Sequence, residues 1–216
     1  FPVLLFSHGA VGYRLQSTFL TAHLASWGYV VAAPDHPSRD LFNVLGGTAT
    51  GDRASSVTEL LGALDLALAD PVVGSHVDAT RVAAIGHSAG GGTVVRVAAD
   101  PRVAGYVSMA SGALGETINE ALPDVPSFFL SGALDAVAPL ATVTQPAFDA
   151  APTPTLLWVL DSVGHNGFDD LCTYGGGTGI IGVADASGLG AVLDANPNLR
   201  KLGEDGCLAP AVPVSE

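Results

Sequence analysis

Short apolar runs alternate with longer segments of helical periodicity over most of the chain. The short runs are apolar throughout, which is typical of parallel strands covered on both faces. These runs predict strands at 2–6, 29–33, 81–85, 103–109, 127–131 and 155–160. Apolar residues at helical spacing between them predict helices at 15–27, 53–68 and 89–99.

Strands and helices that alternate along a chain indicate an α/β fold. The expected architecture is a mostly parallel, doubly wound sheet with helices on both faces, in one domain over residues 1–216 with no large lid domain. Residues 38–52 are predicted to form a Gly-rich loop and 180–193 a helix weakened by its glycines. Turns are predicted at 196–198 and 203–206.

The composition excludes several classes of partner. The chain has 216 residues, 48% of them hydrophobic, which is enough to build a core that needs no disulfide or metal to fold. Its 21 acidic and 8 basic residues give a net charge of −13, which repels nucleic acid and anionic lipid. No apolar run approaches the ~18–20 residues needed to span a bilayer. Because the chain opens directly in an apolar stretch, we expect a processed or trimmed N-terminus.

Two cysteines occur, Cys172 and Cys207. An even pair in an otherwise Cys-free chain is compatible with one disulfide and an oxidising compartment, and the alternative is two unrelated buried thiols. No pair of histidines has metal-ligand spacing, and the cysteines lie too far apart for a zinc knuckle. The chain has no dinucleotide-binding or phosphate-binding glycine motif, so neither a metal nor a cofactor is expected.

Ser88 lies in the segment Gly86-His87-Ser88-Ala89-Gly90, between a predicted strand and a predicted helix. This Gly-x-Ser-x-Gly pattern in a strand–turn–helix context is typical of a nucleophile elbow. The turn projects the serine above the sheet, and the helix start offers N–H donors to a developing oxyanion. The alternative is a Gly-rich turn with an inert serine.

A serine needs a base to take its proton. In this kind of fold the order along the chain is serine, acid, histidine, and His165 is the one histidine after Ser88. Asp135 follows a predicted strand and is the best acid, with Asp161 as the second choice. His165 could instead be an exposed loop histidine, and His8 is interpreted as a structural residue.

The oxyanion donors are predicted to be the amides of Ala89, directly after the nucleophile, and of Ala10, in the loop after the first strand. The residues predicted to line the substrate cleft are Val11, Tyr13, His87 and Phe168.

Taken together, the segments 6–9 (Phe-Ser-His-Gly), 86–91, 132–139 and 164–165 resemble a secreted bacterial branch of the α/β-hydrolases. That branch includes platelet-activating-factor acetylhydrolase-like, dienelactone-hydrolase-like and cutinase-like polyester hydrolases. The resemblance covers roughly residues 1–170 and implies carboxylester hydrolysis without a cofactor. It assigns Ser88, Asp135 and His165 to a catalytic triad, and Ala10 and Ala89 to the oxyanion hole.

The chain departs from this group in three ways. Members usually carry one or two strands before the first one here, so the N-terminal edge is expected to be either trimmed, with edge strands missing, or minimal. Ala10 and Ala89 are small where relatives carry larger side chains, and polyester-cleaving relatives have an aromatic residue at the place of Ala10. The segment after Phe168 resembles no part of this group that we can assign.

The sequence therefore predicts a serine carboxylester hydrolase that acts through an acyl-enzyme on short-acyl or otherwise accessible esters, with polyesters among the candidates. The alternatives are another serine acyl-transfer enzyme (a peptidase, thioesterase or acyltransferase) and a non-catalytic binding module with the same fold. We expect a monomer, secreted or periplasmic.

Overall fold

The computed structural model describes residues 1–112 and 121–211. In this part of the chain the strands form a single parallel sheet with the order β2-β1-β3-β4-β5-β6. All the predicted strands are present, each within two residues of its predicted ends. They are β1 (Val3–Ser7), β2 (Val30–Ala32), β3 (Val82–His87), β4 (Val103–Met109), β5 (Ser127–Gly132) and β6 (Thr155–Leu160).

The predicted helices are also present, with shifted ends. They are α1 (Thr18–Ser26), α3 (Arg53–Ala69) and α4 (Ala89–Val97), and α5 (Gln145–Ala150) is an addition that sequence reasoning did not assign. The predicted loop at 38–52 contains a further helix, α2 (Leu41–Gly46). Asp40 starts it, because its carboxylate accepts hydrogen bonds from the amides of Phe42 and Asn43 and so satisfies two otherwise unpaired donors.

The two faces of the sheet carry separate apolar cores. On one face Leu60 and Leu64 of α3 and Val94 of α4 pack on alternate residues of the central strands, such as Val3 and Leu5. On the other face Phe6, Ile85 and Met109 pack with Phe168 and with Leu20 of α1. The alternation along β1 therefore places the sheet between helices, as predicted for a strand covered on both sides.

The segment after Phe168, here called the tail (residues 169–211), is mostly helical. It forms α6 (Tyr174–Gly177), α7 (Gly179–Ala186), α8 (Gly190–Ala195) and α9 (Pro197–Glu204). The single helix predicted at 180–193 is interrupted at Gly188, whose φ of +82° ends α7. The turn predicted at 196–198 is wrong, because Pro197 begins α9, where its missing N–H costs nothing.

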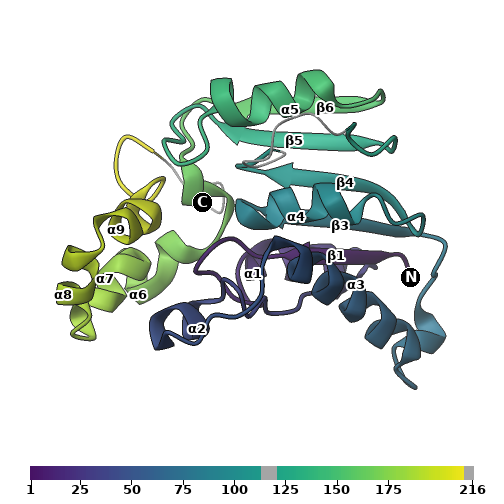
Figure 1. Cartoon of the computed structure of the whole chain (residues 1–216), viewed down its shortest axis with the longest axis horizontal. Helices are drawn as coiled ribbons and strands as arrows, with labels where there is room; N and C mark the ends of the chain where they lie inside the picture. The colour runs from purple at the N-terminus through teal and green to yellow at the C-terminus, as the bar shows by residue number, and fades with distance from the viewer. Residues whose placement is uncertain (113–120, 212–216) are drawn as a thin grey trace.

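Figure 1 shows the tail helices grouped beyond the carboxyl ends of the strands, on the side where the loops after β1, β3 and β5 emerge. A disulfide between Cys172 and Cys207 joins the two ends of the tail, which confirms the predicted pairing. The tail therefore lies against the edge of the sheet at which parallel α/β folds place their sites.

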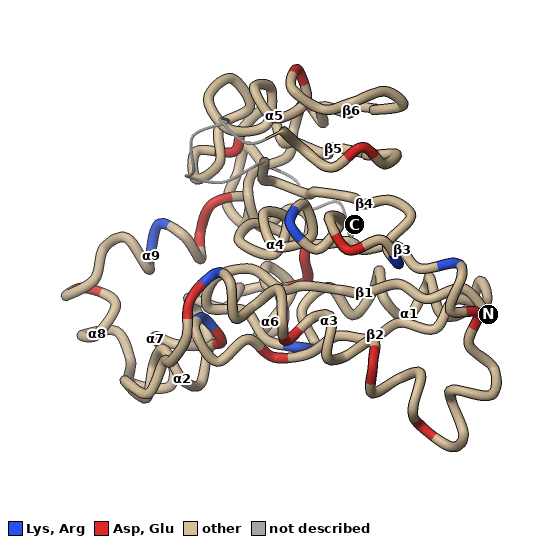
Figure 2. Tube along the Cα trace, turned by 45° about the vertical axis from the view of Figure 1, so that its right-hand side comes forward, with Lys and Arg blue, Asp and Glu red and all other residues tan. Residues whose placement is uncertain are grey.

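Figure 2 shows acidic positions on many helices and loops, with a few basic positions scattered among them. Along the described part of the chain, no helix has both the length and the apolar character needed to cross a bilayer.

Candidate active site

Ser88 occupies the sharp turn between β3 and α4, with φ 54° and ψ −121°. A positive φ is unfavourable for a residue with a Cβ, and such conformations persist where the surrounding structure holds them. Here the amide of Ser88 donates to the carbonyl of Met109 on the neighbouring strand. The turn is thus the strained elbow that the Gly-x-Ser-x-Gly pattern predicts.

The two glycines of this pattern are required by close backbone contacts. A Cβ on Gly90 would lie 1.9 Å from the carbonyl oxygen of Ser7, and one on Gly86 would lie 2.3 Å from the carbonyl oxygen of Gly90. Both distances are far inside van der Waals contact, so only glycine lets α4 start this close to β1 and β3. The helix start is thereby brought beside the loop that follows β1.

The structure brings together the three side chains that sequence reasoning selected. Ser88 Oγ lies 2.9 Å from His165 Nε2, and His165 Nδ1 lies 2.9 Å from Asp135 Oδ2. Ser88 follows β3, Asp135 follows β5 and His165 follows β6, so the three meet at one edge of the sheet. Asp161, the second choice for the acid, has no contact with His165 among the described interactions.

The Asp135 carboxylate is held in its charged form. Burial alone would disfavour the charge, but hydrogen bonds from His165 and from the amides of Ala138 and Val137 lower the pKa of Asp135 below its usual value. A carboxylate only accepts hydrogen bonds, so His165 Nδ1 carries the proton that faces it. His165 Nε2 therefore presents its lone pair to the hydroxyl of Ser88.

Two amides near Ser88 are free to act as donors. Ala89 is the first residue of α4, and Ala10 lies in the loop after β1. Neither amide donates a hydrogen bond to any acceptor in the part of the chain that the structure describes. Both residues line a common cavity of about 260 Å³ next to the elbow.

Comparison with known proteins places this arrangement in a family. Residues 3–168 match the family model described as PETase, PET hydrolase-like. The chain belongs to the PET hydrolase-like family. Its matched region ends at Phe168, so all the strands that the structure describes and the residues Ser88, Asp135 and His165 lie inside it, and the tail lies outside it.

Several curated relatives resemble the chain at low identity. Cutinase est1 of Thermobifida alba is 27% identical over 158 residues, which are 72% of this chain and 49% of that protein. Cutinase 2 of Thermobifida cellulosilytica is 29% identical over 150 residues, which are 68% of this chain and 53% of that protein. A bis(hydroxyethyl) terephthalate hydrolase of Streptomyces coelicolor is 25% identical over 156 residues, which are 72% of this chain and 46% of that protein. The chain spans about half the length of the curated relatives it matches.

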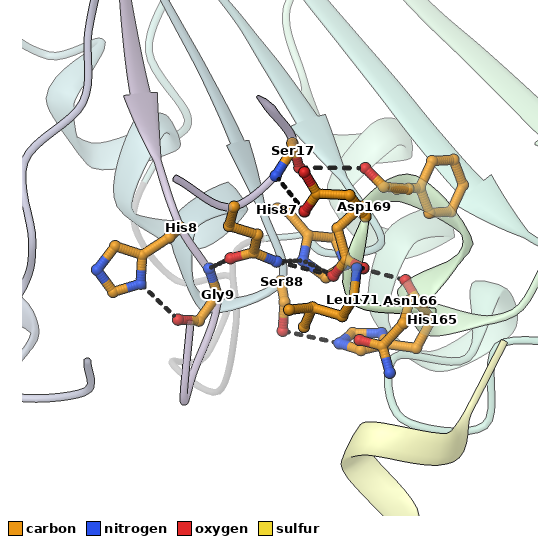
Figure 3. A network of polar contacts seen from close by, with 12 residues as sticks. His8, Gly9, Ser17, His87, Ser88, His165, Asn166, Asp169 and Leu171 are labelled. Atoms are coloured by element: carbon orange, nitrogen blue, oxygen red, sulfur yellow. Dashed lines mark hydrogen bonds and ion pairs between the residues drawn. The ribbon is translucent and has the colours of Figure 1, made fainter. Parts of the chain in front are cut away.

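Behind the elbow of this PET hydrolase-like chain lies a buried polar network that sequence reasoning missed (Figure 3). Gln16 Oε1 accepts from the amide of Gly9 at 2.8 Å. Its Nε2 donates to Asp169 Oδ2 at 2.8 Å and to His87 Nδ1 at 2.9 Å. His87 Nε2 in turn donates to the carbonyl oxygen of His165 at 2.9 Å. The network thus links the loop of Ala10, the elbow and the backbone of His165.

A carboxylate of the tail holds two of the loops at the elbow. Asp205 Oδ1 accepts from the amide of His165 at 2.7 Å, and Asp205 Oδ2 accepts from the amide of Ala136 at 3.1 Å. One tail residue therefore fixes the backbone beside both Asp135 and His165. Asp170 similarly accepts from the amides of Ser17 and Thr18 at the start of α1.

The prediction of cleft residues needs correction at His87 and Phe168. Both are buried, since His87 serves the network and Phe168 packs in a core, and neither is part of the wall of the two described cavities that Ala10 lines. Val11 does line a cavity beside Ala10. Tyr13 is absent from the walls of the same two cavities, and its hydroxyl shares a hydrogen bond with that of Tyr174 at 2.6 Å.

His8 has the structural role that was predicted for it. Its Nδ1 donates to the carbonyl of Gly9 and its Nε2 accepts from the amide of His36. In the described ranges, 1–112 and 121–211, no three His, Cys, Asp or Glu side chains are grouped so that they could hold a metal ion.

Proposed function

We propose that this protein is a serine carboxylester hydrolase, with Ser88 as nucleophile, His165 as general base and Asp135 as the carboxylate that orients the base. The observation that carries the proposal is the continuous line from Ser88 Oγ through His165 to Asp135, with 2.9 Å at each step. This line has the polarity needed for catalysis, because the charged Asp135 leaves the lone pair of His165 directed at the serine.

The reaction follows from these positions. His165 Nε2 accepts the proton of Ser88 as Oγ attacks the ester carbonyl carbon. The resulting oxyanion accepts hydrogen bonds from the amides of Ala10 and Ala89, and one such donor is worth about 10²–10³ in kcat. The protonated His165 then gives its proton to the departing alkoxide, which leaves an acyl group on Ser88. Water activated by His165 releases the acid and restores the serine. No cofactor is needed.

The substrates we propose are short-acyl or otherwise accessible esters, with polyesters included. The names of the relatives, cutinases and a bis(hydroxyethyl) terephthalate hydrolase, support an ester of this kind. The Cys172–Cys207 disulfide supports an oxidising compartment, so we propose that the protein acts outside the cytoplasm, secreted or periplasmic. We propose separately that it is a monomer. The net charge of −13 argues against nucleic acid as a partner.

The test is labelling of the purified protein with a fluorophosphonate probe, together with hydrolysis of p-nitrophenyl esters from acetyl to palmitoyl. We expect labelling and acetate hydrolysis in the unaltered protein, and loss of both in Ser88→Ala. Activity should fall towards the long acyl chains, and a profile that rises to palmitoyl contradicts the short-acyl assignment. Absence of labelling at neutral pH indicates the binding module. Labelling together with faster cleavage of amides or thioesters than of esters indicates one of the other acyl-transfer enzymes.

A further inference from the structure

An apolar cavity of about 200 Å³ lies between the loop of Ala10 and the tail. Its walls are mainly aliphatic side chains from four helices. They include Leu41 and Leu45 of α2, Ile180 and Ala184 of α7, Leu193 of α8 and Leu202 of α9. Most of these residues follow Phe168 and so lie outside the region that matches the family.

The size and lining of this cavity distinguish it from an ordinary packing void. One water occupies about 10–15 Å³ on the same measure of volume, so the cavity is an order of magnitude larger than a single-water site. Apolar cavities of about 150 Å³ stay dry and take up small hydrocarbons. The lining residues Leu45 and Val192 remain 45% and 43% exposed, which leaves an entrance at the rim.

The cavity shares a wall residue with the proposed oxyanion site. Ala10, whose amide is one of the proposed oxyanion donors, lines both this apolar cavity and the more polar one that contains Ala89. Asn166, the residue after His165, forms another part of the wall, and its side chain is fixed to the carbonyl of Leu202 on α9. Through Ala10 and Asn166 the cavity therefore borders the loops that carry the proposed oxyanion donor and the base.

We propose that the tail-built cavity binds a hydrocarbon arm of the ester substrate, a chain of a few carbon atoms or a small ring. This inference rests on the proposed function. Each methylene that moves from water into the cavity is expected to raise kcat/KM by up to about fourfold. The gain should stop once the chain exceeds the length that the cavity holds, which makes the tail the part of the molecule that sets chain-length preference.

The test is a filling variant, Ala184→Phe, with Ala186→Phe as its matched control. Both residues lie on α7, but Ala184 lines the cavity whereas Ala186 is exposed and does not. Two series of esters are compared, p-nitrophenyl acetate to octanoate for the acyl arm, and acetates of ethanol to hexanol for the alcohol arm. We expect Ala184→Phe to lose at least tenfold in kcat/KM on the six-carbon member of one series. Acetate hydrolysis should stay within about twofold of the unaltered protein, and Ala186→Phe should follow the unaltered protein throughout.

The series that loses its length dependence identifies whether the acyl or the alcohol arm enters the cavity. A second variant, Leu45→Asp, places a charge at the partly exposed rim and should weaken the same series even if Ala184→Phe does not fold. The proposal is overturned if neither series changes, or if acetate and hexanoate fall equally. Failure of the proposed function has a different signature, because the unaltered protein would then neither hydrolyse p-nitrophenyl acetate nor react with the fluorophosphonate probe.

Discussion

Two buried histidine–aspartate pairs lie at the same edge of the sheet, and they differ in charge. The rings of His165 and His87 are 4.9 Å apart, and each has an aspartate whose side chain is fully buried. In the first pair His165 Nδ1 is 2.9 Å from Asp135. In the second, His87 Nδ1 is 3.6 Å from Asp169, and Gln16 donates to both.

The orientation of each ring explains this difference. His87 gives its Nε2 proton to the carbonyl of His165, so its Nδ1 has only a lone pair to offer and cannot donate to Asp169. Burial lowers the pKa of His87 to about 3 and raises the pKa of Asp169 to about 8. His165 instead donates to Asp135, whose carboxylate also receives two backbone amides. The same two residue types thus give two different states. At the serine a neutral His165 faces an ionised Asp135, and behind it a neutral His87 faces a protonated Asp169.

The largest expected effect comes from making the same substitution in both pairs. Asp135→Asn offers an N–H to His165 Nδ1, which forces the proton onto Nε2 and removes the lone pair that Ser88 needs. We expect kcat on p-nitrophenyl acetate to fall by about 10³–10⁴-fold. In Asp169→Asn the neutral amide replaces a carboxyl group that is already protonated and neutral, so the kcat of this variant should fall by less than tenfold. Comparable losses in the two variants would contradict the assignment of roles.

The first pair could be predicted from the sequence and the second could not. Ser88, Asp135 and His165 each follow a strand in the order that the fold requires, so local pattern and chain order suffice to find them. Asp169 meets Gln16 across 153 positions of sequence, and neither residue lies in a recognisable motif. The one available signal is His87, a histidine inside the elbow pentapeptide, for which the sequence predicts a place in the substrate cleft rather than in a buried network.

The fold shows the same division between its two parts. The strands were predicted to within two residues because buried parallel strands are apolar throughout. The helices of the tail could not be predicted in this way, because they are short, rich in glycine and held by tertiary contacts such as the disulfide and Asp205. Helices of this length have little stability of their own, so their local sequence carries a weak signal.

An intermediate effect is expected at Gln16, which bridges His87 and Asp169 of the second pair. Gln16→Leu leaves the amide of Gly9 without its acceptor, one residue before the proposed oxyanion donor Ala10. We expect kcat to fall by about ten- to hundredfold, less than for complete loss of an oxyanion donor, with KM little changed. Gln16→Glu keeps an acceptor for Gly9 and should retain more of kcat than Gln16→Leu.

The rates of both Gln16 variants are to be normalised to the fraction of protein that reacts with the fluorophosphonate probe. This separates a misplaced donor from a smaller folded population. If normalisation restores the kcat of Gln16→Leu, or if the two variants lose equal amounts, Gln16 has no positioning role.

The smallest effect expected is on stability, through the proton that Asp169 holds. The folded-state pKa of about 8 lies above the ordinary value of 3.8, so the folded protein keeps a proton that the unfolded chain releases. The free energy of unfolding contributed by this group is therefore fully present below pH 3.8 and declines as the pH rises to about 8. Asn has no proton to lose and escapes this decline.

The measurement is Tm against pH for the unaltered protein and for Asp169→Asn. The difference between the two isolates Asp169 from Asp135, whose lowered pKa has the opposite effect and loses stability as the pH falls. We expect the two proteins to have similar Tm values near pH 4 and the variant to gain several degrees by pH 8. A difference that is constant with pH would mean that Asp169 is already ionised in the folded protein. Asp169 would then be ionised like Asp135, and the two pairs would differ in their geometry alone.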